Sequence, residues 1–385
     1  MSVNLAELSS KILPPAMLGM LGGGQLGRFF VIAAHEMGYR VTVLDPDLNS
    51  PAGKIADVHL CAAYDDREAL ESMAQSCVAI TTEFENVPAE TLEFFEQTRI
   101  VRPAAAAVAT AQHRVKEKNF IRDAGLPVAP FHVIESAADF NSVDAAIYPA
   151  ILKVARFGYD GKGQARVSGR QEAEAAFEQF GGETCVLEKM LALDLEVSVV
   201  LARDVHGHVA TFPVAENSHL NGILDISIAP ARCSDALREK ATALAIELAQ
   251  KLEYVGVLGV EFFVCGDQIL VNEIAPRPHN SGHYTLDGCV TNQFEQQVRV
   301  LTGHALGDAR LHSPSVMVNI LGNIWHDGEP DWAAAFAVPA LKLHLYGKHE
   351  PRAGRKMGHF TVVDANADNA YGLAMQAREA LGIGE

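Results

Sequence analysis

The sequence has few cysteines, no long apolar run and no excess of basic residues. Its six cysteines include no C-x-x-C pair, which favours reduced, mostly buried thiols in a cytoplasmic protein. No stretch reaches the roughly 18 consecutive apolar residues of a membrane-spanning helix, so we expect no membrane partner. A net charge of −17 does not provide the basic face that binds nucleic-acid phosphates, so we expect no nucleic-acid partner either.

The sequence does have enough apolar chain for more than one core. Its 385 residues exceed the roughly 250 to 300 at which a single hydrophobic core stops growing. The 49% hydrophobic and 21% charged residues are close to the average of globular proteins. We therefore expect a folded protein of enzyme size with two or three subdomains.

The first part of the chain alternates between strand and helix patterns. An apolar run ends at Leu21, an amphipathic stretch covers residues 25–37, and apolar runs follow at 41–44 and 78–82. Such alternation predicts a parallel sheet with helices on both faces, which we place in residues 16–112.

Two further regions follow in the sequence. Residues 113–303 contain a strong helix pattern at 235–252 and two consecutive strand patterns at 257–264 and 269–274. Residues 304–385 mix short apolar runs with Gly and Pro. We treat these as the second and third regions of the chain.

Gly22, Gly24 and Gly27 form a G-x-G-x-x-G motif between the first strand and the first helix, and Asp45 closes the next strand. This pattern is typical of a Rossmann dinucleotide site, in which the acid binds a ribose. The same N–H groups could hold the phosphate of a smaller ligand, or the glycines could simply turn the chain. A nicotinamide dehydrogenase is therefore one interpretation of the motif.

A second glycine-rich segment follows Lys153, which lies on a predicted strand. Backbone donors and cations in such a loop can together cover a polyphosphate, and a strand lysine adds a fixed charge, as in kinases. The segment predicts a phosphate-covering loop, and an ordinary surface hairpin is the alternative. Its residues are Gly158, Tyr159, Asp160, Gly161, Lys162, Gly163 and Gln164.

Two otherwise apolar strand patterns carry Glu261, Asn272 and Glu273, which is costly unless these groups pair or bind a metal. If residues 266–267 form a two-residue turn, Glu261 lies opposite Asn272; if Gln268 joins the loop, Glu261 lies opposite Glu273. We prefer the second register, because two carboxylates about 5 Å apart next to nucleotide phosphates would suit Mg²⁺. A carboxylate paired with an arginine such as Arg277 is the alternative.

Together, these motifs resemble those of 5-(carboxyamino)imidazole ribonucleotide synthetases, which are ATP-grasp carboxylases of purine synthesis. The similar segments are the loop of residues 22–27, G-Y-D-G-K-G-Q at 158–164, V-E-F-F at 260–263 and N-E-I-A-P-R-P-H-N-S-G-H at 272–283. The motifs stand in the family's order, and the resemblance runs from about residue 16 to the C-terminus.

The resemblance implies a mixed α/β and α+β architecture. A Rossmann-like, parallel-sheet pre-ATP-grasp domain would cover residues 16–112, an ATP-grasp domain 113–303, and a small C-terminal domain 304–385. The implied protein is a homodimeric ligase with ATP and Mg²⁺ as cofactors. It would carboxylate 5-aminoimidazole ribonucleotide with bicarbonate, through carboxyphosphate, in de novo purine (IMP) biosynthesis, and release ADP and phosphate.

The resemblance also assigns residues to ligands. ATP would be bound by residues 158–164 and by Arg114, Lys153, Glu188, Lys189, Met190, Leu191, Glu196, His219, Asn272 and Glu273. Mg²⁺ would be bound by Glu261 and Glu273. The ribonucleotide, rather than a dinucleotide, would contact the first glycine loop and the segment of residues 83–86. The individual candidates for its site are Gln25, Leu26, Glu85, Asn86, Lys348 and Arg355.

The expected catalytic residues belong to two segments. A cation and neutral donors stabilise charge on a transferring group, so we expect Arg277, His279 and Asn280 to form the bicarbonate and carboxyphosphate pocket. Tyr159, Asp160 and Lys162 would face the point where carboxyphosphate meets the amine.

Other interpretations are left open by the sequence. The nucleotide features also fit a different ATP-grasp ligase, such as a formate-using transformylase, or a non-catalytic nucleotide-binding module. His279 and His283 have a zinc-like spacing, but the Asn-Ser-Gly between them argues against one helix presenting both. His219, Lys348 and Arg355 could be solvated surface residues.

Overall fold

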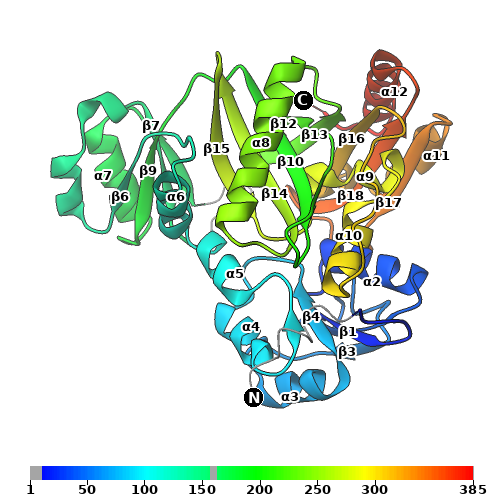
Figure 1. Cartoon of the computed structure of the whole chain (residues 1–385). Helices are drawn as coiled ribbons and strands as arrows, with labels where there is room; N and C mark the ends of the chain where they lie inside the picture. The colour runs from blue at the N-terminus through cyan, green and yellow to red at the C-terminus, as the bar shows by residue number, and fades with distance from the viewer. Residues whose placement is uncertain (1–10, 157–162, 385) are drawn as a thin grey trace.

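The computed structural model describes residues 11–156 and 163–384, which form three sheets with helices packed against them (Figure 1). Along these residues, none of the helices has the length and hydropathy of a bilayer-crossing segment. The mixed α/β and α+β architecture expected from the sequence is confirmed.

The first sheet is parallel, as the alternation of strand and helix patterns predicts. Its strand order is β3-β2-β1-β4-β5. The bounds are Met17–Leu21 for β1, Arg40–Leu44 for β2, Val58–Leu60 for β3, Ala79–Thr82 for β4 and Ile100–Val101 for β5.

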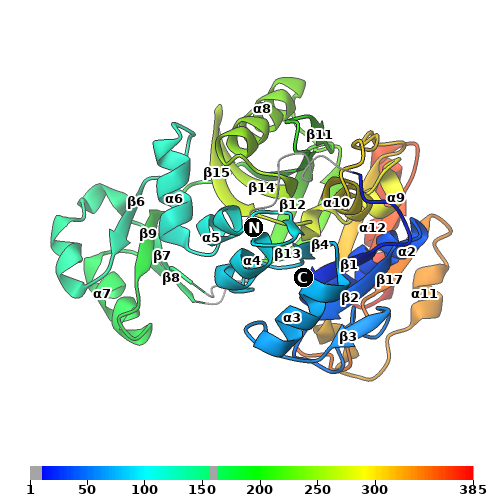
Figure 2. The ribbon, with the colours of Figure 1, turned by 60° about the horizontal axis from the view of Figure 1, so that its bottom comes forward.

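Helices cover both faces of this sheet. Leu18 and Met20 pack with α2 and α10, whereas Leu21 and Ile80 pack with α3, α4 and α5. Successive strand side chains point to opposite faces, so neighbouring residues of β1 belong to different cores. Figure 2 shows α2 and α3 on either side of β1 and β2. These helices are α2 (Gln25–Glu36), α3 (Arg67–Ser76), α4 (Ala89–Glu96), α5 (Ala105–Ala111) and α10 (Gln293–Leu301).

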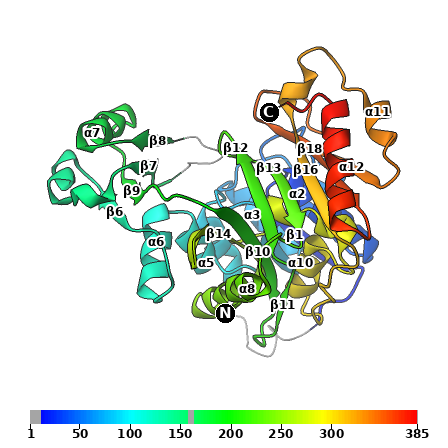
Figure 3. The ribbon, with the colours of Figure 1, turned by 90° about the horizontal axis from the view of Figure 1, so that it is seen from above.

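A small antiparallel sheet forms a separate lobe (Figure 3). Its strand order is β6-β9-β7-β8, and β7 ends just before the predicted phosphate-covering loop. The bounds are Phe131–Ile134 for β6, Ala150–Val154 for β7, Gln164–Val167 for β8 and Cys185–Lys189 for β9. The associated helices are α6 (Arg114–Asp123), α7 (Arg170–Gln179) and the 3-10 turns η1 (Ala137–Ser142) and η2 (Ala145–Ile147).

The largest sheet has nine strands, in the order β15-β14-β10-β12-β13-β16-β18-β17, with β11 paired to β10. This sheet contains strands from both sides of the boundary proposed at residue 303, because β16 pairs with β13. The domain boundaries therefore remain a proposal. The bounds are β10 Leu195–Arg203, β11 Val209–Thr211, β12 Ala215–Leu220, β13 Ile223–Ala229, β14 Gly256–Cys265, β15 Gln268–Ala275, β16 Ser315–Leu321, β17 Leu341–Leu345 and β18 Lys356–Val363.

Helices cover this sheet in two places. α8 packs on β10, β14 and β15 in the largest apolar core, and the predicted helix at 235–252 is confirmed, with Ser234 as its N-cap. α12 packs on β16 and β18 at the other end. The remaining elements are α8 (Asp235–Lys251), η3 (Asn280–Gly282), α9 (Thr285–Gly288), η4 (Gly322–Trp325), α11 (Trp332–Phe336) and α12 (Ala367–Ala380).

Candidate active site

One cavity of about 1150 Å³ brings most of the predicted site residues together. Residues on strands of the two antiparallel sheets, on α2, in the loops after β2 and β4, and in the loop between β17 and β18 line it. Its volume is large for a small-molecule site and leaves room for two substrates. The predicted residues on its lining are Gln25, Leu26, Glu85, Asn86, Arg114, Lys153, Gln164, Glu196, His219, Glu261, Asn272, Glu273, Arg277, His279, Asn280, Lys348 and Arg355.

Ten predicted residues are not placed on this lining. Gly158, Tyr159, Asp160, Gly161 and Lys162 lie outside the described residues. The structure describes the other five but does not place them on the lining: Gly163, Glu188, Lys189, Met190 and Leu191. The ligand contacts assigned to all ten residues stay predictions.

The first glycine loop has its backbone donors occupied by two acidic side chains. Gly23 N donates to Asp45 at 2.7 Å, Gly27 N donates to Glu83 at 2.7 Å, and Gly24 N donates to the other Glu83 oxygen. Burial raises the pKa of Glu83, which lies at the N-terminus of α2. A dinucleotide pyrophosphate would have to displace these carboxylates, so the Rossmann interpretation of this loop is not supported.

Next to this loop, Lys348 joins the C-terminal region to α2. Its ammonium donates to the side chain of Gln25 and, at 2.7 Å, to the carbonyl of Lys356. Arg355 donates to the carbonyl of Glu350 at 2.9 Å, which fixes its position in the same loop. Both predicted cations therefore lie at the cavity, on a loop held against α2.

Lys153 lies on β7 and is positioned by a buried carboxylate. Glu188 on β9 contacts Lys153 at 3.2 Å and Lys118 at 2.7 Å. Burial opposes ionisation of Glu188, but the two ammonium groups lower its pKa to about 2. Glu188 therefore lies beneath the lysine that lines the cavity, where its charge keeps Lys153 in place.

Glu261 and Glu273 lie directly opposite each other on β14 and β15, so the preferred register is confirmed. The longer loop expected with this register is wrong: Cys265 pairs with Gln268, so the turn has two residues. A β-bulge at Asn272 supplies the extra residue that restores the pairing. Burial, together with the charges of Glu273 and Glu196, raises the pKa of Glu261.

Two residues at the N-terminus of α6 approach this acidic pair. Arg114 contacts Glu273 at 3.2 Å, which is the arginine pairing that the sequence left open, although the arginine differs from the one considered there. Glu117 accepts a hydrogen bond from Ile274 N at 2.6 Å. Burial and the charge of Glu273 raise the pKa of Glu117 to about 8. These contacts link α6 to the edge strand of the largest sheet.

Glu196 and His219 form a second pair on the cavity wall. His219 Nδ1 lies 2.9 Å from a Glu196 oxygen, and both side chains are partly exposed. Burial opposes protonation of His219, but the contact with Glu196 and the charge of Glu261 raise its pKa. His219 is therefore part of the site and is not a solvated loop residue.

Arg277 and Glu85 were predicted to bind different ligands but contact each other. Arg277 Nε donates to Glu85 at 2.5 Å and Nη2 donates to its other oxygen at 3.2 Å. Burial opposes ionisation of Glu85, yet Arg277 lowers the pKa of this carboxyl to about 2. Such a two-point pair fixes the guanidinium plane beside the cavity.

His279 and Asn280 present neutral polar groups to the same cavity. Burial and the charges of Arg277 and Lys356 lower the pKa of His279 to about 3, so its imidazole is neutral at physiological pH. Asn280 is buried, and neither atom of its amide has a hydrogen-bond partner among the described residues. A buried polar group of this kind usually has a hydrogen-bond partner, so a bound ligand would supply the partner that the Asn280 amide lacks.

His283 points into a different environment from His279. Its ring stacks on His359 at a centroid distance of 4.7 Å and contacts Phe29 at 5.6 Å. His283 is fully buried in this aromatic cluster, whereas His279 lines the cavity. The divergence of the two rings argues against the zinc interpretation of their spacing.

Several residues at the site were not identified from the sequence. Lys118 could have been found because it lies four residues after Arg114 on one helix face. The others had no local signal, because distant segments bring them to the cavity or beneath it. They are Asp45 in its observed role, Tyr64, Glu117, Arg166 and Lys356.

Three family models match most of the chain between residues 16 and 371. Residues 16–112 match the ribonucleotide synthetase preATP-grasp domain, residues 119–294 the ATP-grasp domain, and residues 315–371 the phosphoribosylaminoimidazole carboxylase C-terminal domain. The N5-carboxyaminoimidazole ribonucleotide synthase of Bacillus subtilis is 43% identical over 359 residues, covering 93% of this chain and 94% of the relative. That of Brucella melitensis is 42% identical, covering 92% and 98%.

Solved structures agree with these matches. An N5-carboxyaminoimidazole ribonucleotide synthetase in complex with ADP superposes with a TM-score of 0.91 at 41% identity, covering 96% of this chain and 98% of that one. The Aspergillus clavatus N5-carboxyaminoimidazole synthase in complex with ADP and 5-aminoimidazole ribonucleotide gives 0.88 at 31% identity, covering 98% and 100%. The chain therefore belongs to the N5-carboxyaminoimidazole ribonucleotide synthetases, the ATP-grasp ligases of purine biosynthesis.

Proposed function

We propose that this ligase transfers the carboxyl group of bicarbonate to the exocyclic amine of 5-aminoimidazole ribonucleotide. Bicarbonate would attack the γ-phosphorus of ATP, giving carboxyphosphate and ADP. The amine nitrogen would then attack the carboxyl carbon, the C–O bond to phosphate would break, and the amine would lose a proton. The observation that carries the proposal is a single cavity lined both by Lys153, Glu261 and Glu273 and by Lys348 and Arg355.

ATP is assigned to the side of the cavity formed by β7, β10, β12 and the acidic strands. Arg114 and Lys153 carry the positive charges for its phosphates, and Glu188 keeps Lys153 directed there. Glu196, held by His219, has an accepting carboxylate available for the ribose hydroxyls. Gln164 and Asn272 also line this part of the cavity.

Mg²⁺ is assigned to Glu261 and Glu273. Glu261 lies directly opposite Glu273 on the neighbouring strand, and Asn272 Nδ2 donates to its carboxylate at 3.3 Å. Two carboxylates with nucleotide phosphates fit this ion, which usually keeps few protein ligands. When bound, Mg²⁺ would neutralise charge on the phosphoryl oxygens.

Bicarbonate and carboxyphosphate are assigned to Arg277, His279 and Asn280. The guanidinium is held flat by Glu85, the imidazole is neutral, and the buried amide of Asn280 lacks a partner among the described residues. Fixed donors of this kind stabilise a charge that develops during transfer because they need no reorganisation. Tyr159, Asp160 and Lys162 remain our candidates for the transfer point, although they lie outside the described residues.

The ribonucleotide is assigned to the first sheet and the C-terminal loop. Gln25, Leu26, Glu85 and Asn86 line this side. Lys348 and Arg355 have the charge to bind its 5′-phosphate. The occupied glycine loop supports this assignment, since its N–H groups already bind Glu83 and Asp45.

The quaternary structure and location are also proposals. We infer a homodimer from the family resemblance and a cytoplasmic location from the six cysteines, all of which are free thiols. Sedimentation at micromolar concentration would test the dimer, and a monomeric mass would contradict it.

A coupled ADP-release assay tests the function. ADP release should require bicarbonate together with 5-aminoimidazole ribonucleotide. Absence of substrate-dependent ADP release would refute the proposal. Release with formate and glycinamide ribonucleotide instead would favour a transformylase.

A further inference from the structure

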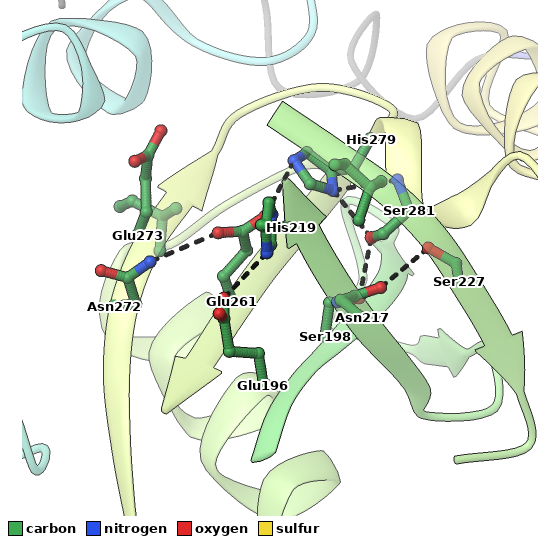
Figure 4. A network of polar contacts seen from close by, with 12 residues as sticks. Glu196, Ser198, Asn217, His219, Ser227, Glu261, Asn272, Glu273, His279 and Ser281 are labelled. Carbon is green, nitrogen blue, oxygen red and sulfur yellow. Dashed lines mark hydrogen bonds and ion pairs between the residues drawn. The ribbon is translucent and has the colours of Figure 1, made fainter. Parts of the chain in front are cut away.

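His279 ends a chain of buried polar groups that no ligand contact explains. Figure 4 shows that consecutive hydrogen bonds connect Ser227, Asn217, Ser198 and Ser281, in this order, to the imidazole. The separations are 2.8 Å from Ser227 Oγ to Asn217 Oδ1, 2.8 Å from Asn217 Nδ2 to Ser198 Oγ, and 2.7 Å from Ser198 Oγ to Ser281 Oγ. A last contact of 2.8 Å joins Ser281 Oγ to His279 Nδ1.

The main chain determines which nitrogen of His279 carries the proton. Ser281 N donates to His279 Nδ1 at 3.3 Å, and a main-chain N–H can only donate. Nδ1 is therefore an acceptor, and in a neutral ring the proton must lie on Nε2. Ser281 Oγ can then satisfy its own contact with Nδ1 only by donating.

The chain behind Ser281 supports this direction. If Ser281 Oγ donates to the ring, it must accept from Ser198 Oγ, which in turn accepts from Asn217 Nδ2. Asn217 Oδ1 accepts from Ser227, which is the last donor of the hydrogen-bonded chain. All four residues are at most 6% exposed, so bulk water cannot readily replace a missing donor.

Contacts to the main chain and to β14 also fix the position of the His279 ring. Gln293 accepts from His279 N at 2.8 Å and donates to His279 O at 2.9 Å, which holds the main chain. A Cβ added at Gly259 would lie 2.7 Å from His279 Cβ, so β14 closely supports the side chain from below. Nε2 lies 3.5 Å from Glu261 on the side that lines the cavity.

We propose that Ser281, Ser198 and Asn217 are positioning residues that hold His279 as the Nε2–H tautomer, so that it donates a hydrogen bond to the carboxyl group being transferred. This inference rests on the proposed function for the identity of the acceptor. The opposite tautomer would present a lone pair to an anionic group and would repel it. None of the three positioning residues lines the cavity.

The tautomer can be measured in the free enzyme, without activity. In protein labelled with ¹⁵N at histidine, His279 should give a pyridine-type shift at Nδ1 and a pyrrole-type shift at Nε2. The signal is assigned by its loss in His279→Gln. A pyrrole-type Nδ1 in the wild type would overturn the proposal, whereas failure of the ADP-release assay alone would affect only the proposed function.

Ser198→Ala tests the hydrogen-bonded chain at the residue that donates to Ser281. We expect kcat to fall on the order of 10-fold, less than the roughly 100-fold typical of removing a catalytic donor, with the KM for ATP unchanged. The His279 shifts should move toward a mixture of tautomers, and Ser198→Thr, which keeps the hydroxyl, should restore both readouts. A loss of activity with unchanged shifts would contradict the proposal.

Ser315→Ala is the matched control. Ser315 is also a fully buried serine of the same sheet. Its hydroxyl donates to the carbonyl of Ser313 and is not part of the hydrogen-bonded chain that leads to His279. It should leave the His279 shifts and kcat unchanged. If it moved the His279 shifts as far as Ser198→Ala does, the effect would be general to the sheet and the proposal would be wrong.

Discussion

Glu83 lies at the N-terminus of α2, where a glycine loop of this spacing would otherwise receive a ligand phosphate. Its two oxygens accept from Gly24 and Gly27, and Asp45 accepts from Gly23. The positive end of the helix thus stabilises a side chain of the protein itself. We therefore expect the substrate phosphate to bind the cations of the C-terminal loop instead.

Glu83→Gln should destabilise the protein with little change in shape. The amide has one acceptor oxygen for two main-chain donors, so one buried N–H loses its partner, at a cost of about 1 to 3 kcal/mol. Urea unfolding measures the difference. Glu93→Gln, on the exposed face of α4, should change stability by less than about 0.5 kcal/mol, and equal effects of the two changes would contradict this role.

Lys348→Ala and Arg355→Ala should each raise the KM for the ribonucleotide while leaving ATP affinity nearly unchanged. Both side chains line the cavity from the C-terminal loop, and loss of one charged contact to a phosphate costs about 1.5 to 3 kcal/mol, or roughly 10-fold to 100-fold in KM. Steady-state kinetics with each substrate varied separately make the comparison. A collapse of ATP affinity would show that our assignment of these residues is wrong.

At the scale of elements, the bulge in β15 sets the geometry of the acidic pair. Without an extra residue, the two-residue turn at 266–267 would place Glu261 opposite Asn272. The bulge instead brings Glu273 opposite Glu261 and leaves Asn272 able to contact it. Bulges are common beside active sites because they redirect a side chain without ending the strand.

Gly259→Ala should disturb the contact between β14 and the segment that carries His279. The added Cβ would meet His279 Cβ, and neither backbone can move freely, so we expect a loss of about 1 to 3 kcal/mol in stability together with a lower kcat. Thermal unfolding and the ADP-release assay measure both effects.

Gly372→Ala is the control for that change. Gly372 lies on an exposed part of α12, and a Cβ there meets no atom within 4 Å. Alanine should therefore stabilise the protein by about 0.5 to 1 kcal/mol and leave kcat unaltered. If both glycine substitutions behaved alike, the proposed contact would not be responsible.

At the scale of the whole molecule, buried charges join the small lobe to the largest sheet. Lys118 on α6 contacts Glu188 on β9 and donates to the carbonyl of Asn272 on β15 at 2.8 Å. Glu117, next to it, accepts from Ile274 N. Through Glu188, the helix α6 thus fixes Lys153 relative to the acidic strands β14 and β15.

Glu117 predicts a pH dependence of stability with a definite sign. Its folded pKa of about 8 exceeds the usual value, so between about pH 4.5 and pH 8 the unfolded chain has released a proton that the folded chain retains. The contribution of Glu117 to stability is therefore present at low pH and is lost as pH rises through this window.

Glu117→Gln should remove this dependence, because glutamine keeps the acceptor for Ile274 N without a charge. At pH 5 the variant and wild type should melt at similar temperatures. At pH 8 the variant should melt higher, by at least the roughly 2 to 4 °C that 1 kcal/mol represents in a large domain. A constant difference across this range would contradict the raised pKa.

Much of the fold could be predicted because its signals are local. The strand and helix alternation of residues 16–112 and the helix at 235–252 follow from hydrophobic period alone. The motifs at 158–164 and 272–283 led to the family. The continuation of one sheet across residue 303 had no such signal, because strand pairing between distant segments leaves no mark in either segment.

Residue type and spacing along the chain were enough to predict the order of elements, the family and many of the residues on the cavity lining. The contacts between these residues came from the folded structure: Glu83 and Asp45 accept from the donors of the glycine loop, Glu85 holds Arg277, and a chain of serines and an asparagine orients His279. These relations depend on the distance and direction between groups far apart in the chain. Packing of the three sheets around one cavity fixes them.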